Sequence, residues 1–171
     1  MKTLFLVRHA KSGWDDPTLD DHDRPLDLRG ERAALVVGRY AAQRRFVPET
    51  VLCSSARRTR DTLDLVLSQW SDVPSIEIDR DLYLVGEHGL RKRLAAVDPE
   101  VRSVMIVGHS PDLHDLALGL AARGDDTLRE NLREKFPTAA FATLKLPVDT
   151  WSDLPLGVAT LVAYVTPKDL V

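Results

Sequence analysis

The chain has 171 residues, of which 29% are charged and 44% hydrophobic, the composition of a soluble globular protein with one domain, 1–171. Its formal net charge of −3 leaves no positive surplus to neutralise a nucleic-acid backbone, and no segment has the apolar length of a membrane span. The apolar run before Arg8 is too short for a signal-peptide core, and a single cysteine excludes an intramolecular disulfide. We therefore expect a cytoplasmic protein without nucleic-acid or membrane partners.

The first half of the chain alternates between strand-like and helix-like segments. A strand is predicted at about 2–8, followed by an acidic, turn-rich loop at 13–27. Asp27 can cap a helix that runs to about Arg45. Beyond it, the pattern predicts a buried parallel strand at 51–53, a helix at 56–69 capped by Ser54 or Ser55, and a short strand at 73–79.

The second half continues this alternation and then changes character. It predicts a helix from about Glu87 to Val97, a buried strand at 104–107, and a helix from Ser110-Pro111 to about Ala122. Residues 123–138 are polar and irregular, with one short helix near 127–134, and the runs 139–146 and 158–166 look like an antiparallel hairpin. The pattern predicts an α/β protein: a three-layer α/β/α sandwich with a mainly parallel sheet, helices on both faces and a C-terminal antiparallel hairpin.

Three apolar runs end in residues suited to phosphate or proton chemistry. The first delivers Arg8 and His9, the second leads to the basic cluster 57–60, and the third gives His109. Because parallel strands end at one edge of a sheet, these side chains can converge although they lie far apart in sequence. A guanidinium holds phosphate oxygens, and an imidazole is a nucleophile or a base at neutral pH. Successive strand residues face opposite ways, so Arg8 and His9 can share one site only if the strand bends there.

Four stretches resemble the histidine phosphatase superfamily, in particular its small SixA-type branch. They are Leu-Val-Arg-His-Ala-Lys-Ser (6–12), Asp-Arg-Pro-Leu-Asp-Leu-Arg-Gly (23–30), Cys-Ser-Ser-Ala-Arg-Arg-Thr-Arg-Asp-Thr (53–62) and Ile-Val-Gly-His-Ser-Pro (106–111). Their order and spacing match together across residues 4–122. The resemblance implies a phosphatase that needs no metal or other cofactor and forms a covalent phosphohistidine intermediate.

The resemblance also implies a role for individual residues. His9 would be the nucleophile that accepts the phosphoryl group, and Arg8 would hold phosphate oxygens together with an arginine of the 57–60 cluster. Arg58 is preferred to Arg57 for this role, because the family places its arginine four residues before a threonine, here Thr62.

The second histidine of the implied pocket is His109, which would donate a hydrogen bond to a phosphate oxygen. Ala10 stands where many relatives carry glycine, and the side chain stays small. Neighbouring guanidinium charges disfavour imidazolium, so we expect the pKa of His9 to be lowered.

Larger relatives also supply a carboxylic acid that protonates an alcohol leaving group. No residue is a convincing counterpart; Glu87 is the best candidate, but an acidic residue in the first turn of a helix is more typical of simple helix stabilisation, and Asp16 is a weaker candidate. An imidazole leaving group, with a pKa near 6.5, needs little help from an acid. The pattern therefore favours phosphohistidine, in particular on a protein, or another labile phosphate as the substrate.

Further residues are expected at the rim of the pocket or outside it. Lys11, Ser12 and Trp14 could line the rim, with Trp14 either a lid or a packing anchor. Cys53 is interpreted as a buried core residue and Arg24 as a residue that fixes its loop. The remaining polar side chains are interpreted as solvated loop or helix surface: His22, His88, His114, Arg29, Arg91, Lys92 and Arg93.

Other functions are compatible with the same residues. A non-catalytic protein that binds phosphate or a phosphopeptide would keep the pocket without turnover, and a phosphatase for a small phosphomonoester would use the same nucleophile. A metal-dependent hydrolase and a mutase fit less well. The sequence leaves the oligomeric state open.

Overall fold

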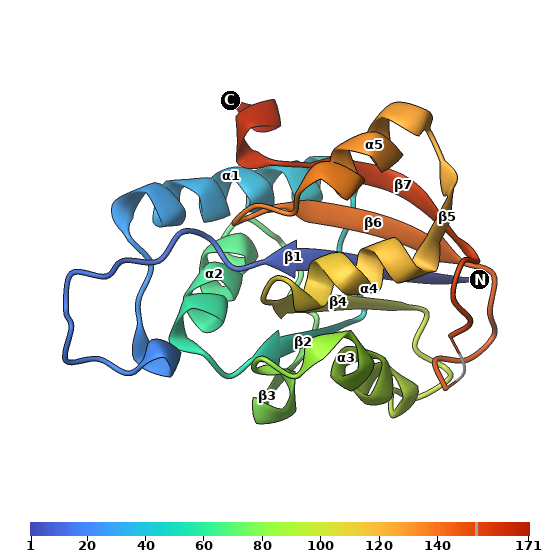
Figure 1. Ribbon diagram of the computed structural model, residues 1–171, viewed down its shortest axis with the longest axis horizontal. Coiled ribbons are helices and arrows are strands. Elements are labelled where there is room, and N and C mark those ends of the chain that lie inside the picture. Colours follow the sequence, from blue (N-terminus) through green and yellow to red (C-terminus); the bar gives the residue numbers. More distant parts are fainter. Residues whose placement is uncertain (153) are drawn as a thin grey trace.

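A seven-stranded sheet forms the centre of the molecule within residues 1–152 and 154–171, which the computed structural model describes (Figure 1). The strands are β1 (Lys2–Arg8), β2 (Thr50–Ser54), β3 (Ser75–Asp79), β4 (Ser103–Gly108), β5 (Ala121–Gly124), β6 (Phe141–Leu146) and β7 (Ala159–Val165). Their order is β3-β2-β4-β1-β6-β7-β5. Neighbours are parallel except where β6 pairs with β1 and with β7, so the predicted mainly parallel sheet with an antiparallel hairpin is confirmed.

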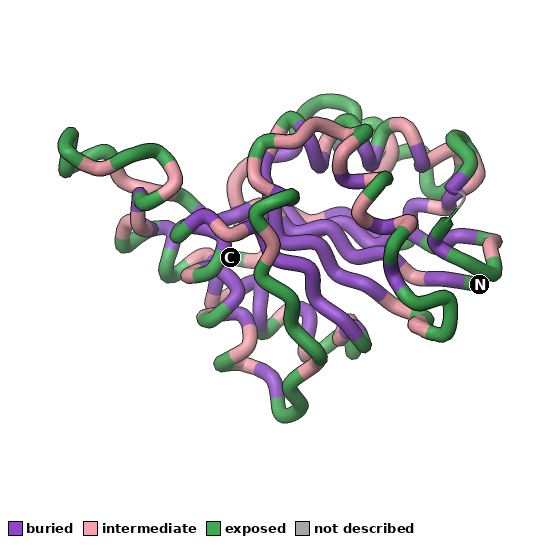
Figure 2. Tube along the Cα trace, turned by 90° about the horizontal axis from the view of Figure 1, so that it is seen from below, coloured by how far each residue is buried: buried purple, intermediate pink, exposed green. Residues whose placement is uncertain are grey.

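Helices cover both faces of this sheet, as Figure 1 shows. The helices α1 (Leu28–Arg44) and α2 (Arg57–Leu67) pack on one face, and α3 (Gly86–Ala95), α4 (Asp112–Leu120) and α5 (Asp126–Glu134) pack on the other. Figure 2 shows the central strands buried between these two layers, whereas the edge strands β3 and β5 are largely exposed. Of the described helices, none combines the length and the apolar character needed to cross a membrane.

The side chains of β1 point alternately to the two faces of the sheet and so contribute to two separate layers of the core. Phe5 and Val7 belong to the cluster under α1 and α2, whereas Leu4 and Leu6 belong to the cluster under α3 and α4. All four side chains are at most 4% exposed. Burial on both faces explains why this strand reads as a continuous apolar run, as central parallel strands do.

The register of the central strands brings their carboxyl ends together. Leu6 of β1 lies opposite Ile106 of β4, and Ile106 lies opposite Leu52 of β2. The segments that follow β1, β2 and β4 therefore leave the sheet side by side. This edge is where the sequence predicted a functional site.

Two predicted helix caps are wrong. Ala56 occupies the N-cap of α2, and its side chain has no polar atom to cap the helix. The hydroxyls of the predicted caps bond elsewhere, that of Ser54 to His109 and that of Ser55 to His22. The α4 helix begins at Asp112 with Pro111 at its N-cap, so Ser110 does not cap it.

The predicted irregular segment 123–138 contains more structure than its pattern indicated. Ala121–Gly124 forms β5, which pairs in parallel with β7 at the sheet edge. Its four residues are too few and too polar to show a strand period. The short helix predicted near 127–134 is confirmed as α5, and the Asp125 carboxylate caps it by accepting from the Leu128 N–H at 3.1 Å.

Candidate active site

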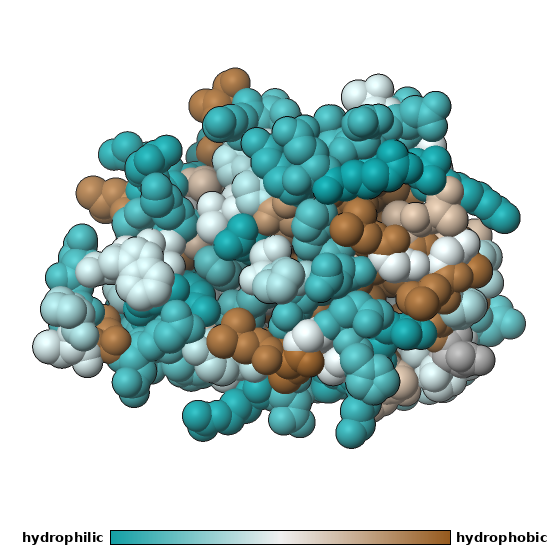
Figure 3. Space-filling model, viewed as in Figure 1, coloured by the Kyte–Doolittle hydropathy of each residue, from teal (hydrophilic) through white to brown (hydrophobic). Residues whose placement is uncertain are grey.

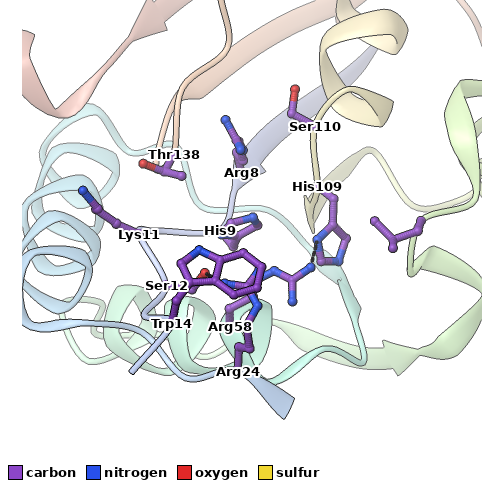
Figure 4. A pocket seen from close by; sticks show the side chains of 11 residues that line it. Arg8, His9, Lys11, Ser12, Trp14, Arg24, Arg58, His109, Ser110 and Thr138 are labelled. Atoms are coloured by element: carbon purple, nitrogen blue, oxygen red, sulfur yellow. Dashed lines mark hydrogen bonds between the residues drawn. The ribbon is translucent and has the colours of Figure 1, made fainter. Parts of the chain in front are cut away.

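A pocket of about 350 Å³ opens where β1, β2 and β4 end, and we call it the strand-edge pocket (Figure 4). Side chains from distant parts of the chain line it: Arg8, His9, Lys11, Ser12, Trp14, Arg24, Arg58, Leu84, His109, Ser110 and Thr138. The structure thus brings together His9, Arg8, Arg58 and His109, the four residues to which the resemblance gave catalytic roles. It also places Lys11, Ser12 and Trp14 at the same pocket.

The backbone turns at the end of β1, which lets both Arg8 and His9 reach the pocket. The Ala139 N–H donates to the carbonyl oxygens of Arg8 and His9 at 3.2 and 3.0 Å. Successive carbonyls of a regular strand point in opposite directions, so one donor can serve both only where the strand bends. Ala139 itself adopts a left-handed conformation, with φ of 61°. The bend that the sequence argument required is therefore present.

His9 is held as a neutral ring with one particular nitrogen unprotonated. Its Nδ1 lies 2.7 Å from the carbonyl oxygen of Ala10. A carbonyl can only accept, so Nδ1 carries the proton and Nε2 keeps a free lone pair. Burial is the main cause that lowers the pKa of His9 to about 4; the Ala10 hydrogen bond opposes the shift, and the charges of Arg58 and Arg8 add to it. The expected pKa depression is thus present, but burial contributes more than the arginines.

His109 faces His9 across the pocket, with ring centroids 5.4 Å apart. The Arg58 Nη2–H donates to His109 Nδ1 at 3.3 Å, so Nε2 carries the proton and donates to the Ser54 hydroxyl at 2.8 Å. Burial first, and then the neighbouring His9 and Arg58, lower the pKa of His109 to about 3. Both histidines of the pocket are therefore neutral near pH 7. The single ring N–H of His109 is already bonded to Ser54, so the expected hydrogen bond from His109 to a phosphate oxygen is not available in this arrangement.

Asp21 holds the Arg58 guanidinium in place from outside the pocket. Arg58 is 3% exposed, and it donates to the Asp21 carbonyl at 2.7 Å and to the Asp21 carboxylate at 3.0 Å. The same carboxylate accepts from the Tyr83 hydroxyl at 2.5 Å and from Arg24. Partial burial raises the pKa of Asp21, but the hydrogen bonds from Tyr83 and Arg24 and the Arg58 charge lower it to about 2. The sequence pattern of the loop 13–27 gave no indication that Asp21 has this role.

Arg24 lines the pocket as well as fixing its loop, although the sequence argument assigned it only the second role. Its Nη1 donates to the Ser12 hydroxyl at 2.7 Å, and its guanidinium carbon lies 3.5 Å from the centroid of the Trp14 ring. Trp14 is 74% exposed, so it covers Arg24 from the solvent side. The sequence feature that could have identified Arg24 as a pocket residue is its position in the motif stretch 23–30.

Arg8 completes the cationic lining of the pocket. Its Nη1 donates to the carbonyl oxygen of Phe136 at 2.9 Å, while Nη2 and Nε make no hydrogen bond to any described residue. Together with Lys11, Arg24 and Arg58 it makes the pocket strongly positive, and no carboxylate stands among its described lining residues. The arrangement suits a dianionic group such as phosphate.

The motif stretch 23–30 braces the loop that follows β1. The Asp27 N–H donates to the Lys11 carbonyl at 3.0 Å, and the Asp27 carboxylate caps α1 by accepting from the Gly30 N–H at 2.8 Å. Gly30 packs so closely that a Cβ there would lie 2.0 Å from the Lys11 carbonyl oxygen. From the other side, the Thr62 hydroxyl accepts from the Ala10 N–H and donates to the Arg58 carbonyl.

The structure does not bring Arg57, Glu87 or Asp16 to the pocket. Arg57 has a side chain 51% exposed, and it pairs with Asp61 one helical turn further on. Glu87 lies in the first turn of α3, where its carboxylate is 3.6 Å from Arg91. The Asp16 carboxylate accepts from Thr18 in an exposed turn. None of the three sequence candidates is therefore placed to touch a bound phosphate or its leaving group.

Two other residues that the sequence argument set aside have clear surroundings. Cys53 is fully buried in β2, and burial raises the pKa of its thiol to about 12, as expected of core filler. His22 is half-buried rather than solvated, with Nε2 2.8 Å from the Ser55 hydroxyl and its ring edge-on to Tyr83. Among the described residues, no group of three His, Cys, Asp or Glu side chains comes close enough together to hold a metal ion.

Comparisons with known proteins agree with this site and fold. The model of the histidine phosphatase superfamily (branch 1) matches residues 4–83. An uncharacterized protein of Mycobacterium tuberculosis (strain H37Rv) is 35% identical over 164 residues, which cover 95% of this chain and 100% of that protein. A candidate phosphohistidine phosphatase SixA from Nakamurella multipartitia superposes with a TM-score of 0.81 at 30% identity, covering 97% of this chain and 96% of that one.

A further solved structure carries an oxyanion. It is the protein histidine phosphatase SixA complexed with tungstate, which covers 99% of both chains with a TM-score of 0.77 and 25% identity. The sequence match and the shared fold show that this chain belongs to the histidine phosphatase superfamily and that it resembles SixA-type members over nearly its whole length.

Proposed function

We propose that this protein is a phosphatase that removes the phosphoryl group from phosphohistidine on a protein, by way of a covalent phosphohistidine intermediate on His9. The observation that carries the proposal is the hydrogen bond from His9 Nδ1 to the Ala10 carbonyl, inside a pocket lined by Arg8, Arg58 and His109. It leaves Nε2 as the unprotonated nitrogen among cationic donors, which is what a nucleophile toward phosphate requires.

In the first step, His9 Nε2 attacks the phosphorus of the substrate and a new N–P bond forms. The bond from phosphorus to the substrate nitrogen breaks, and its electron pair leaves with that nitrogen. When the other ring nitrogen of the substrate carries a proton, the leaving group departs as neutral imidazole. Arg8 and Arg58 then stabilise the charge on the equatorial oxygens of the transferring group.

In the second step, water attacks the phosphorus of phospho-His9. The N–P bond breaks, the electron pair returns to Nε2, and phosphate leaves with both protons of the water. His9 regains its neutral form with the proton on Nδ1, where the Ala10 carbonyl has held it throughout. The site is then ready for another cycle.

The lining of the pocket favours phosphohistidine over a phosphate ester as the substrate, because of what each leaving group requires. An alkoxide leaving group needs a proton from an acid, and the described residues that line the pocket include no carboxylate. Imidazole leaves without such help because its pKa is near 6.5. The tungstate complex of the related SixA adds support, because tungstate is an oxyanion of phosphate-like charge and shape.

A parallel assay of two phosphopeptides tests the proposal. We expect the wild type to dephosphorylate a phosphohistidine peptide, and phosphoramidate, much faster than a phosphoserine peptide of the same sequence. His9→Ala should lose this activity by a factor of about 10³ or more, as expected when a nucleophile is removed. Tight vanadate binding without hydrolysis of any of these substrates would instead indicate a phosphate-binding protein.

A further inference from the structure

A second cavity of about 280 Å³ adjoins the strand-edge pocket, and we call it the basic groove. Lys11 and Thr138 line both cavities, so the groove is an extension of the pocket, and Figure 4 shows these two side chains on the same side of His9. Its other walls come from the start of α1, the α5–β6 connection and the C-terminal 3-10 helix Pro167–Leu170: Arg29, Ala33, Lys135, Pro137, Thr166, Pro167 and Lys168.

The groove concentrates positive charge on a chain whose net charge is −3. Lys11, Arg29, Lys135 and Lys168 are its cations, all four are exposed, and none pairs with a carboxylate within 4 Å among the described residues. Arg29 also lies in the first turn of α1, where the helix dipole disfavours a cation. These four charges are therefore unpaired among the described residues and available to an anionic ligand.

Two carboxylates, Asp169 and Glu134, lie near the groove without forming an ion pair with its four cations, so the cations outnumber them. Asp169 accepts from the N–H and hydroxyl of Thr166 at 2.8 and 3.1 Å, so it caps the C-terminal 3-10 helix. Glu134 is exposed and lies outside the lining. The backbone that carries Lys135 is fixed because its carbonyl accepts from the Tyr164 hydroxyl.

We propose that the basic groove binds an acidic segment of the phosphorylated protein substrate, next to the phosphorylated residue. The cations come from separate segments around the groove rather than from one converging cluster, which suits carboxylates spaced along a polypeptide. Ala33, Pro137 and Pro167 provide apolar surface between them for side-chain methylenes. The face of the molecule seen in Figure 3 is mainly hydrophilic, with hydrophobic side chains in separate groups. In the groove itself, the four cations make charge the main basis for docking.

This inference deepens the proposed function, and its test uses substrates that differ only in flanking charge. One phosphohistidine peptide carries Asp and Glu beside the phosphorylated residue, and the other carries Ser at the same positions. The variant is Lys135→Glu combined with Lys168→Glu, because both lysines line the groove and neither lines the strand-edge pocket. Lys135→Glu and Lys168→Glu are also tested singly, and each is matched in charge by the control Lys92→Glu, an exposed charge reversal on α3.

For the double variant we expect kcat/KM on the acidic peptide to fall about tenfold, mainly through a higher KM. Added salt should lower kcat/KM on this peptide less in the double variant than in the wild type. The Ser-flanked peptide and phosphoramidate should change by less than about twofold. The Lys92→Glu variant should match the wild type on every substrate. Equal losses on both peptides, or no loss on either, would overturn the inference.

Binding of the unphosphorylated acidic peptide separates this inference from the proposed function. If wild type binds the peptide and the double variant does not, while neither hydrolyses phosphohistidine, the groove is supported and the proposed reaction is not. If wild type hydrolyses both phosphopeptides equally well and the double variant is unaffected, the reaction is supported and the groove is refuted.

Discussion

At the scale of single residues, the chemistry depends on keeping two adjacent histidines neutral while surrounding them with cations. The ring of His9 gives its Nδ1 proton to a backbone carbonyl, and the ring of His109 gives its Nε2 proton to Ser54. Their pKa values are lowered to about 4 and about 3, with burial as the first cause for each. The nucleophile is therefore ready at neutral pH without a separate base.

The lowered pKa of His9 predicts how stability depends on pH. Unfolded histidine binds a proton below its ordinary pKa of 6.5, whereas folded His9 does not until about pH 4. The free energy of unfolding should thus be fully retained above pH 6.5 and should fall as the pH drops from 6.5 toward 4. Urea unfolding across this range gives the free energy of unfolding at each pH. His9→Asn should reduce the slope of that free energy against pH by up to about 1.4 kcal/mol per pH unit. Identical slopes for the wild type and His9→Asn would contradict the lowered pKa of His9.

The neighbouring arginines of α2 allow a matched comparison. Arg58→Lys keeps the charge, but a single ammonium cannot bond the Asp21 carbonyl, the Asp21 carboxylate and His109 together, as the guanidinium does. We expect kcat/KM for phosphoramidate to fall by about 10² to 10³. Arg57→Lys, one residue earlier and solvent-exposed, should stay within about twofold of wild type. A larger loss for Arg57→Lys than for Arg58→Lys would reverse the assignment of the pocket arginine.

At the scale of elements, the start of α1 acts as a brace for the nucleophile loop. Asp27 links the cap of α1 to the Lys11 carbonyl, and Gly30 allows the helix to approach that carbonyl. The sequence contained both residues in a recognisable motif, but their function as a brace depends on tertiary contact. Local pattern alone therefore predicted the helix and its cap without predicting what the helix holds.

Substitution of Gly30 tests the brace. In Gly30→Ala the new Cβ would lie 2.0 Å from the Lys11 carbonyl oxygen, so the backbone of the loop must shift. We expect kcat/KM to fall about 10²-fold, because small displacements of a reacting group are costly. Gly119→Ala within α4 is the control, since its Cβ would meet only the end of the Leu156 side chain, at 3.3 Å. Equal activity of the two variants would show that the loop does not depend on this contact.

At the scale of the whole molecule, the parallel sheet determines which residues meet. The shared edge of β2, β4 and β1 was predictable in outline, because three apolar runs each led to polar groups suited to phosphate, whereas the strand order and register were not predicted. That pattern anticipated the convergence of His9, His109 and the basic cluster 57–60, and the family resemblance singled out Arg58 within the cluster. The pattern rested on strand geometry, which is regular enough to infer from a sequence.

The loops were harder to predict for a physical reason. Asp21 and Arg24 lie in the segment 13–27, whose path is set by hydrogen bonds to partners far along the chain, such as Arg58 and Tyr83. No periodicity marks such contacts in advance. Glu87 shows the opposite case, because its position at a helix start was compatible with two roles, and only the fold places it beside Arg91, outside the pocket.

The covalent intermediate on His9 is the central claim, and trapping it is the most direct test. Wild-type protein mixed briefly with radiolabelled phosphoramidate and quenched in base should retain labelled phosphate that is stable to base and labile to acid. Peptide mapping by mass spectrometry should place it on His9, and His9→Ala should retain none. Label on another residue such as Ser12 or His109, or near-normal turnover by His9→Ala, would contradict the account.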